Sequence, residues 1–407
     1  MSSQFSESSR SAGRTLTTAV MVFAILTLSA VPAAAQWRMT PSISAGLNYD
    51  DNIRLNTNSL LEESVSGWAL EGDARISYDT QLAKFSLTPR LRLNRYDGKS
   101  ELDSDDVFLD FDYIYTGQLS RFQFRGRYGD ESVRTAERSN IDFQTDDPAD
   151  IPADDSGRVF GTENRQRVLL APSWSYQTGE KSTIRLGVRY LDVAYDETLL
   201  STLRDFSESR GQASFEYDSS ERNTIGLSSY YRQNEFAGTA GDPTGYGLTL
   251  DFNRSLSEKT RFKLGAGFDS TEDSSGTDQS NPIGEISIIH KLQTSRVLAS
   301  YQRSVQGSGS AEMSVRDSIS LNLTRDLSER FSVGAGLRAY QTRALDSGAT
   351  NFDERDYVQI GGLFIWKLTR AFSVDFDYRH TYSDRSTLAS DASSNQATLW
   401  FRYRPIR

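Results

Sequence analysis

The stretch VFLDFDYIYTGQLSRFQFRGRY, residues 107–128, contains a short polar turn between two alternating segments. Apolar residues occupy every second position on both sides of the turn: Val107, Leu109, Phe111, Tyr113 and Tyr115, then Phe122, Phe124 and Tyr128. A period of two places successive side chains on opposite faces of a β-strand. The stretch therefore predicts a β-hairpin with one apolar face and one largely polar face.

The same alternation recurs from Ile43 to Tyr403. Polar turns separate successive strand pairs, usually at intervals of 34 to 41 residues, which indicates one repeated structural unit. The turns are Gln81–Lys84, Gln118–Arg121, Thr178–Lys181, Ser219–Arg222, Leu256–Lys259, Gln293–Arg296, Leu327–Arg330 and Leu368–Ala371. Eight turns join sixteen strands, and one strand at each end makes eighteen.

The other connections are longer and rich in Asp, Ser, Gly, Asn and Thr, and aromatic residues flank several turns on the apolar face. Short turns on one side and long loops on the other are typical of outer-membrane barrels. We therefore predict an all-β fold for residues 36–407: a closed antiparallel transmembrane β-barrel of about 18 strands, with 16 as the alternative, short periplasmic turns and long outer loops. A soluble β-sandwich or a β-helix is the competing fold. Pro89 and Pro172 interrupt predicted strands, and we expect β-bulges there.

The composition excludes several classes of protein. The 407 residues include no Cys and two His, which removes disulfide frameworks, thiolate zinc sites and thiol nucleophiles. The mean hydropathy of -0.54 excludes a polytopic helical membrane protein, but a barrel that hides every second residue from lipid has such a value. The net charge of -10 argues against nucleic-acid binding.

Residues 1–35 have the features of a secretory signal peptide. Arg10 and Arg14 precede an apolar stretch from Leu16 to Leu28, and small residues follow Pro32 at positions 33–35. This pattern predicts export, with the mature chain beginning at Gln36. An uncleaved anchor helix is the alternative.

If the apolar residues of each strand face lipid, their neighbours line a lumen. The arginines expected to face inward lie in the third, fifth, sixth and seventh strands: Arg90, Arg92, Arg121, Arg125, Arg127, Arg167, Arg185 and Arg189. The acids expected there are Glu71, Asp73, Asp110 and Asp112, and later strands offer smaller groups such as Ser320, Asn322 and Thr398. At this strand number side chains do not fill the interior, so an aqueous channel is expected.

The third outer loop, residues 130–164, is long and acidic. One hypothesis is that it folds into the barrel and sets carboxylates against the arginines, which would constrict the pore. The candidate constriction residues are Asp142, Asp146, Asp147, Asp150, Asp154 and Asp155. A disordered, solvated loop is the other interpretation.

Arginines in a lumen suit anions or acidic sugars, because guanidinium binds carboxylate and phosphate through paired hydrogen bonds. Carboxylates on neighbouring strands could equally neutralise these arginines and only stiffen the wall. The sequence leaves both interpretations open.

The chain resembles the beta-barrel porin 2 family of outer-membrane proteins, some encoded beside exopolysaccharide genes. The resemblance rests on Pro41–Ile53 and on a repeated pattern of Tyr or Phe, a Ser-Glu-Arg or similar turn and a short strand, seen at Tyr217–Leu227 and Leu323–Leu337. It implies an outer-membrane barrel that acts as a conduit or accessory factor for secreted polysaccharide. Together with the arginine-lined lumen, this leads us to expect a porin-like aqueous channel for the export or passage of polysaccharide, oligosaccharide or anionic solutes. For a barrel in the outer membrane we expect outer-membrane lipid, lipopolysaccharide and the barrel-assembly machinery as partners. One departure is that Tyr403 is followed by four more residues, whereas many such barrels end on an aromatic residue.

Other functions have weaker support. His380 near Ser383 and Asp384, and His290 at a turn, lack the spacing of a specific catalytic motif, so we expect no enzyme and name no catalytic residue. Acidic clusters at 103–106 and 146–155 do not match an EF-hand, so neither a metal nor a cofactor is expected. A non-conducting structural barrel, or one that binds partners through its loops as an adhesin does, is the main alternative.

Overall fold

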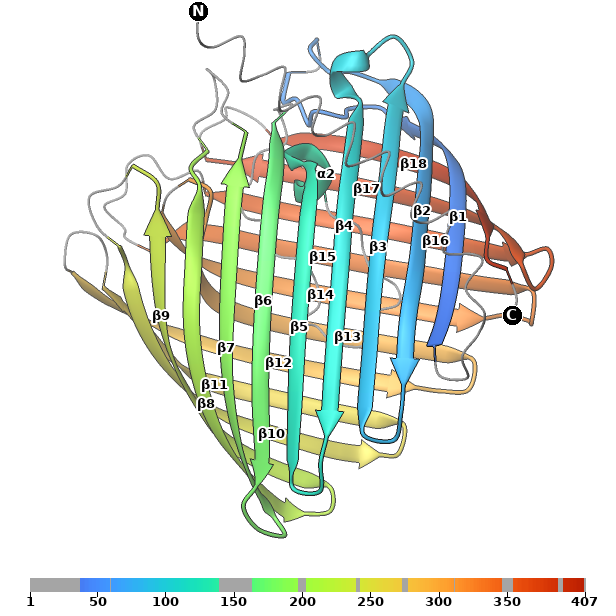
Figure 1. Cartoon of the computed structure of the whole chain (residues 1–407). Coiled ribbons are helices and arrows are strands. Elements are labelled where there is room, and N and C mark those ends of the chain that lie inside the picture. Colours follow the sequence, from blue (N-terminus) through green and yellow to red (C-terminus); the bar gives the residue numbers. More distant parts are fainter. Residues whose placement is uncertain are drawn as a thin grey trace, which may run out of the picture.

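The chain folds into one closed antiparallel β-barrel of eighteen strands (Figure 1). The computed structural model describes residues 37–58, 60–138, 163–196, 203–238, 242–272, 277–310, 312–345, 354–386 and 391–405. Each strand pairs with the next in sequence, and the last strand pairs with the first over Ile43↔Tyr403 to Asp50↔Gln396. The predicted closed antiparallel barrel and the count of eighteen strands are confirmed.

The strands are 12 to 15 residues long. Their bounds are β1 Trp37–Asp50, β2 Val65–Asp79, β3 Ala83–Tyr96, β4 Ser104–Thr116, β5 Ser120–Ser132, β6 Asn164–Gln177, β7 Ser182–Tyr195, β8 Phe206–Ser220, β9 Asn223–Phe236, β10 Thr244–Ser257, β11 Thr260–Glu272, β12 Asp278–Lys291, β13 Ser295–Gly307, β14 Met313–Asp326, β15 Phe331–Ala344, β16 Arg355–Lys367, β17 Phe372–Arg385 and β18 Ala392–Tyr403. Two short helices, η2 (Ser100–Leu102) and α2 (Val133–Glu137), follow β3 and β5. The predicted leader, residues 1–35, lies outside the described residues.

All eight predicted turns join the strands for which they were predicted, from the β2–β3 turn to the β16–β17 turn. They lie at one end of the barrel, and the longer connections lie at the other, which we call the loop end (Figure 1). Backbone hydrogen bonds close the turns, such as Gly117 N to Ser120 O at 2.7 Å. The hairpin order thus follows directly from the polar turn motifs.

The bulges expected at Pro89 and Pro172 are not present. In the described strands, β3 pairs with β2 at Asp73↔Arg90 and again at Ile76↔Leu87, so the register is unchanged across the proline. Only the pairs of Thr88 and Pro89 with β2 are missing, while Pro89 stays opposite Leu109 of β4. The reason is that a residue in an antiparallel strand bonds to one neighbour only, so the missing N–H opens the ladder on one side.

Large apolar side chains cover the outside of the wall. Examples exposed on well-separated strands are Leu47, Leu186, Leu250, Ile319 and Phe376. Aromatic rings contact one another from strand to strand near the turns, as in Trp37–Tyr78 at 4.9 Å and Phe372–Tyr403 at 4.6 Å between ring centroids. Among the described residues, no helix has both the length and the apolar character needed to cross a bilayer.

Candidate channel interior

The inner face of the barrel carries cross-strand pairs of arginine and carboxylate. Five of the eight arginines predicted to line the lumen are paired in this way: Arg92 with Glu71 at 2.8 Å, Arg125 with Asp112 at 3.5 Å, Arg127 with Asp110 at 3.5 Å, Arg185 with Glu216 at 3.3 Å, and Arg189 with Glu208. The members of a pair stand opposite or diagonally opposite on adjacent strands, where opposite charges stabilise a sheet. The pairing favours a stiff, partly neutralised wall on this side.

The other predicted lining residues are placed as follows. The Arg90 guanidinium lies 4.2 Å above the Phe108 ring centroid, and Asp73 stands opposite Ser42 of β1. Arg121 is exposed beside the β4–β5 turn, and Arg167 is half-buried in β6. The six aspartates proposed for a constriction, between positions 142 and 155, lie outside the described residues.

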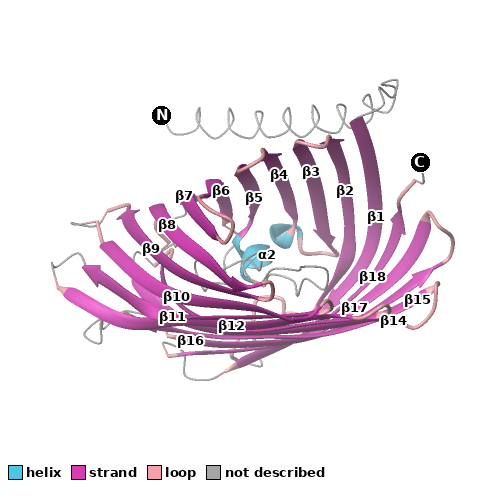
Figure 2. Ribbon diagram, turned by 90° about the horizontal axis from the view of Figure 1, so that it is seen from below, coloured by secondary structure: helices cyan, strands magenta, loops and turns pink. Residues whose placement is uncertain are grey.

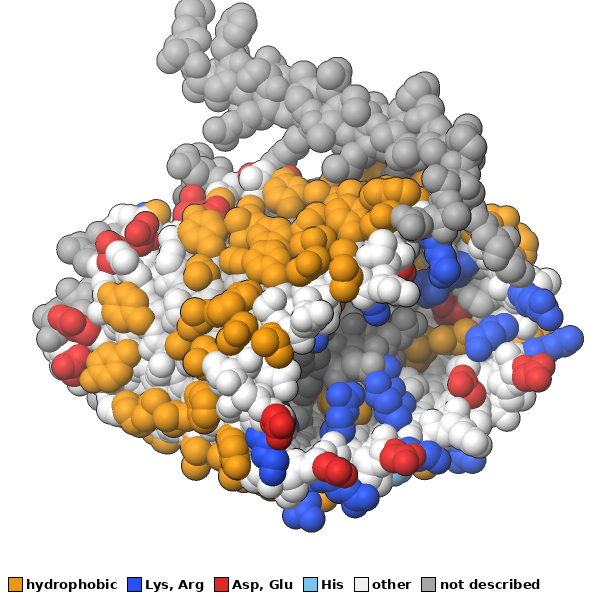
Figure 3. Space-filling model, turned by 60° about the horizontal axis from the view of Figure 1, so that its bottom comes forward, with side chains coloured by type: hydrophobic (Ala, Val, Ile, Leu, Met, Phe, Trp, Pro, Cys, Tyr) orange, Lys and Arg blue, Asp and Glu red, His pale blue; other side chains and the backbone are white. Residues whose placement is uncertain are grey.

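A cavity of about 1190 Å³ occupies the lumen beside β5–β13. Nine basic and four acidic side chains line it. Asp112, Glu208 and Asp317, which pair with Arg125, Arg189 and Arg303 of the lining, bring the acids to seven, so the group keeps a small positive excess although the chain is net negative. The basic residues are Arg125, Arg185, Arg189, Arg210, Arg222, Arg254, Arg261, Lys263 and Arg303, and the acids are Glu216, Glu221, Asp251 and Glu285. Figure 3 shows the hollow from the turn end, with basic and acidic side chains around it and hydrophobic side chains over the adjoining wall.

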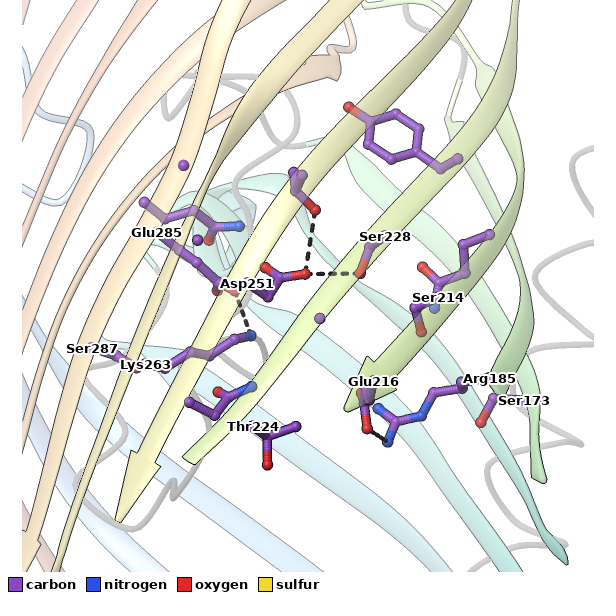
Figure 4. Close-up of a pocket in the computed structure, with 18 of the residues that line it drawn as sticks. Ser173, Arg185, Ser214, Glu216, Thr224, Ser228, Asp251, Lys263, Glu285 and Ser287 are labelled. Atoms are coloured by element: carbon purple, nitrogen blue, oxygen red, sulfur yellow. Dashed lines mark hydrogen bonds and ion pairs between the residues drawn. The ribbon is translucent and has the colours of Figure 1, made fainter. Parts of the chain in front are cut away.

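Polar pairs hold the lining in place. Lys263 binds Glu285, and Ser228 donates a 2.8 Å hydrogen bond to Asp251 (Figure 4). Arg185 and Glu216 bind each other across β7 and β8 in the same view. Because these side chains restrain one another, the cavity has a polar surface that water and small solutes can contact without displacing the wall.

A second arginine cluster lies on the inner face of β14–β16, at positions that are not among the predicted lining residues. Arg316 lies 3.8 Å above the Tyr340 ring, and Arg355 lies 5.0 Å from the Tyr357 ring, which stacks on Tyr340 at 4.8 Å. All four side chains are buried on the inner face of β14–β16. Ser320 and Asn322, which the alternation of β14 predicts to face inward, are buried. The same alternation, continued to the loop end of each strand, predicts that Arg316 and Arg355 also face inward.

Helix α2 lies inside the barrel (Figure 2). The Ser132 hydroxyl accepts a hydrogen bond from Thr135 N and begins the helix. At the other end Arg138 donates to Asp50 of β1 at 2.6 Å, to Ile53 O at 3.0 Å and to Ser394 of β18 at 2.6 Å. The first turn of the third outer loop therefore crosses the inside of the barrel from β5 to the β1–β18 seam.

The first outer loop is held by charge. Lys99 binds the Glu63 carboxylate at 2.6 Å and Arg54 binds it at 3.0 Å. The hydrogen bond from Lys99, with the bond from Arg54, lowers the pKa of Glu63 below its ordinary value although partial burial opposes the shift. Ile53 N also donates to Glu63 O at 3.2 Å, so this residue fixes the loop through its backbone as well.

The histidine candidates do not form a catalytic group. His380 and Ser383 lie three residues apart on β17 and therefore face opposite sides of the strand; Ser383 is buried with the inner set, and His380 contacts Asn395 at 3.0 Å. His290 contacts Thr260 at 2.8 Å near a turn. In the parts of the chain that the structure describes, no three acidic or histidine side chains cluster in a way that could hold a metal ion.

Together these features define the chain as an up-and-down β-barrel with an apolar exterior and a charged, partly filled lumen. No family model and no curated protein matches the sequence. Solved structures with a similar fold include the outer membrane channel DcaP of Acinetobacter baumannii, with 12% identity, a TM-score of 0.45 and coverage of 92% of this chain and 99% of that one. A BenF-like porin from Pseudomonas fluorescens Pf-5 has 10% identity, a TM-score of 0.47 and coverage of 90% and 99%. OccK2 (OpdF) of Pseudomonas aeruginosa, solved with glucuronate, has 11% identity, a TM-score of 0.46 and coverage of 90% and 98%. At this level the likeness concerns the barrel architecture alone.

Proposed function

We propose that this protein is an outer-membrane, porin-like channel that favours anionic solutes, including acidic oligosaccharides. The observation that carries the proposal is the cavity of about 1190 Å³ inside a closed wall, with nine basic and four acidic side chains around it. A low-dielectric wall concentrates the field of such an excess of positive charge, which raises the local concentration of anions. The sequence of residues 1–35 supports export to the membrane.

The apolar exterior supports insertion into a bilayer. Closed barrels satisfy every backbone hydrogen bond within the wall, which is one of two ways in which a chain can cross hydrocarbon. Residues such as Leu47 and Leu250, both 60% exposed, would contact lipid there. For a barrel in the outer membrane we propose lipopolysaccharide and the barrel-assembly machinery as partners.

Planar bilayer recording of the purified, refolded protein tests the proposal. We expect discrete current steps and, in a KCl gradient, a reversal potential of the sign that marks anion preference. Replacing Arg210 and Arg261 of the cavity with Gln should lower the anion-to-cation permeability ratio by roughly half. Arg325→Gln, which removes an exposed charge from the outward face of β14 near the turns, opposite Val333, is the control and should leave the ratio unchanged.

The competing function is a barrel that conducts nothing and acts through its loops. The apolar cluster inside the loop-end half of the lumen favours this function, because it fills space that an open channel needs. Absence of current steps in repeated recordings of correctly folded protein would establish it in place of the channel. Reduction of the current by oligogalacturonate, but not by a neutral glucan of the same length, would identify acidic sugar as a ligand.

A further inference from the structure

The barrel wall divides between β12 and β13 near the loop end. β12 pairs with β11 along its length, from Thr260↔His290 to Glu272↔Asp278. Its pairing with β13 ends at Gly284↔Arg303. Among the described residues β13 continues to Gly307 and β12 begins at Asp278, so facing segments of both strands have no partner across this line.

Pro282 explains why the wall divides at this point. The residue keeps its place opposite Phe268 of β11 but has no N–H to donate toward β13. At Pro89 and Pro172 the ladder also opens on one side, yet it resumes in the same register within three residues. At Pro282 the described part of β13 does not return to β12, because it packs elsewhere.

We call residues 304–310 and 312–316, at the loop end of β13 and β14, the inner hairpin. It lies against the inner face of β7–β9, although three strands separate β9 from β13 in the wall. Arg232 of β9 donates a 2.8 Å hydrogen bond to Val305 O, and Arg204 N, just before β8, donates to Gly309 O at 2.8 Å. A Cβ added at Gly307 would lie 3.1 Å from the Phe236 ring, so backbone and wall are in close contact there.

Apolar packing accompanies these hydrogen bonds. The inner hairpin contributes Val305, Met313 and Val315 to one buried cluster with residues on the inner face of β7–β9. Val133 of α2 belongs to the same cluster. The wall residues in this cluster are Leu191, Val193, Tyr195, Phe206 and Phe236. On a strand that stayed in the wall, positions 305 and 315 would share the face of Tyr301 and Ile319, which point outward. Folding inward turns this face from lipid to the inner wall and buries it.

A charged anchor lies beneath the hairpin. Arg232 is 1% exposed and Asp269 of β11 is 0% exposed, and they bind at 2.8 Å. Arg232 also donates to Thr271, and the Tyr230 hydroxyl donates to Asp269. Gly247 of β10 leaves room for this group, because a Cβ there would lie 2.3 Å from the Tyr230 ring. The one guanidinium therefore joins the wall charge at Asp269 to the hairpin backbone at Val305.

We propose that Arg232 and Asp269 are positioning residues that hold the inner hairpin across the lumen, and that this hairpin sets the narrowest cross-section of the channel. The inference rests on the proposed channel function. A released hairpin has a defined alternative place: continuing the β12–β13 register would set Ile283 opposite Ser304 and Ser280 opposite Gly307. That pairing would complete the wall and widen the loop-end half of the lumen.

Cysteine pairs test where the hairpin lies, and the chain contains no native cysteine to interfere. In Asn234→Cys/Gly307→Cys the two sites adjoin only if the hairpin lies on β9, since a Cβ at 307 is 3.4 Å from Asn234 Oδ1. In Ser280→Cys/Gly307→Cys they adjoin only if the hairpin stays in the wall. We expect mild oxidation of the folded protein to cross-link the first pair and leave the second reduced. The opposite pattern would overturn the inference.

Conductance tests what the hairpin does. Arg232→Met/Asp269→Leu removes both charges together, so that neither is left buried alone. We expect its single-channel conductance to rise about twofold or more, with slower cross-linking of the 234/307 cysteine pair in the same background. Arg185→Met/Glu216→Leu removes a matched pair from the wall away from the hairpin and should not change the cross-linking rate. Arg232→Lys, which keeps a donor for Asp269, should retain most of the wild-type conductance and cross-linking rate.

A shortened protein provides the same test without touching the anchor. Residues 306–314 are replaced by Asn-Gly, which joins the paired residues Val305 and Val315 through a two-residue turn. Larger conductance supports the inference. A wild-type protein that conducts while both variants show unchanged conductance would overturn it and leave the channel intact. A silent wild type whose variants are also silent would overturn the proposed function, whereas current in the variants alone would show that the hairpin closes the pore.

Discussion

Glycine residues show how closely the strands approach one another. A Cβ added at Gly67 of β2 would lie 2.0 Å from the backbone oxygen of Arg95 in β3, and a peptide oxygen cannot move aside as a side chain can. At Gly72 of the same strand, no atom among the described residues lies within 4 Å of the added Cβ. Two glycines five residues apart therefore have opposite structural roles.

Gly67→Ala should destabilise the folded barrel by about 1–3 kcal/mol, because the added methyl group forces the β2 and β3 backbones apart. Gly72→Ala should be neutral or slightly stabilising, since alanine loses less backbone entropy in a strand. Urea unfolding in lipid vesicles, followed by tryptophan fluorescence, measures both. Equal stability of the two variants would contradict the close approach at Gly67.

The Glu63 carboxylate predicts a pH dependence for the first outer loop. Its folded pKa is lowered by Lys99 and Arg54, so its stabilising contribution is fully present above the ordinary value of 4.5 and is lost as the pH falls through the folded pKa. Hydrogen exchange at Ile53 N, which bonds to Glu63 O, should therefore accelerate in acid once corrected for intrinsic exchange. Glu63→Gln should already exchange fast at pH 7. Equal exchange rates of Ile53 N in the wild type and in Glu63→Gln at pH 7 would show that the Glu63 charge does not stabilise the loop.

At the scale of elements, α2 ties the third outer loop to the seam of the barrel. Arg138 and Asp50 are 8% and 5% exposed, so each is nearly removed from solvent. A buried pair that loses one member leaves an unpaired charge, which costs far more than the loss of an exposed pair. The position of α2 in the barrel therefore depends much more on the Arg138–Asp50 pair than on the five residues of the helix.

Arg138→Met should lower the free energy of unfolding by about 3–5 kcal/mol, or release α2 locally and speed proteolysis of the loop that follows it. Adding Asp50→Asn to the same chain should recover part of the loss, because the unpaired charge is gone. Asp105→Asn is the control: Asp105 is 55% exposed in its pair with Arg95 and should cost less than about 1 kcal/mol. Limited proteolysis and urea unfolding distinguish the global effect from the local one.

Across the whole molecule, the sign of the charge that lines the cavity differs from the sign of the net charge of the chain. The net charge is -10, whereas the cavity lining is dominated by arginine and lysine. Long-range repulsion of anions by the loops and attraction by the cavity both weaken with salt, but they act over different distances. The cavity acts within a few ångströms of the solute and is less screened.

Anion preference should therefore fall between 0.1 M and 1 M KCl without reversing, as the Debye length shrinks from about 10 Å to about 3 Å. Reversal potentials measured at a constant concentration ratio across the bilayer give the permeability ratio at each ionic strength. Preference for cations at 1 M salt would show that the positive cavity is not on the conducting path.

Most of the architecture could be predicted from local sequence. The alternation in residues 107–128 and the eight polar turns determined the hairpins, their order and the strand count, because a period of two specifies faces without reference to distant residues. The same alternation predicts one face for Arg92 and Glu71, which stand opposite each other on β3 and β2 and bind there. The bulges expected at the prolines were wrong, since one missing donor opens a ladder without shifting its register.

The interior of the loop-end half was decided by tertiary structure. Ile283 lies on a strand with apolar residues on both faces, so the alternation does not specify which face is inward. In the structure Ile283 packs against the cluster that contains Val305 and Met313. Local periodicity cannot show that a hairpin leaves the wall and lies across three strands onto Arg232, because that contact joins residues 73 positions apart. Sequence alone determined which side of most strands carries the apolar residues, and only the closed barrel decided which segments fill its centre, because filling depends on the space that distant strands enclose.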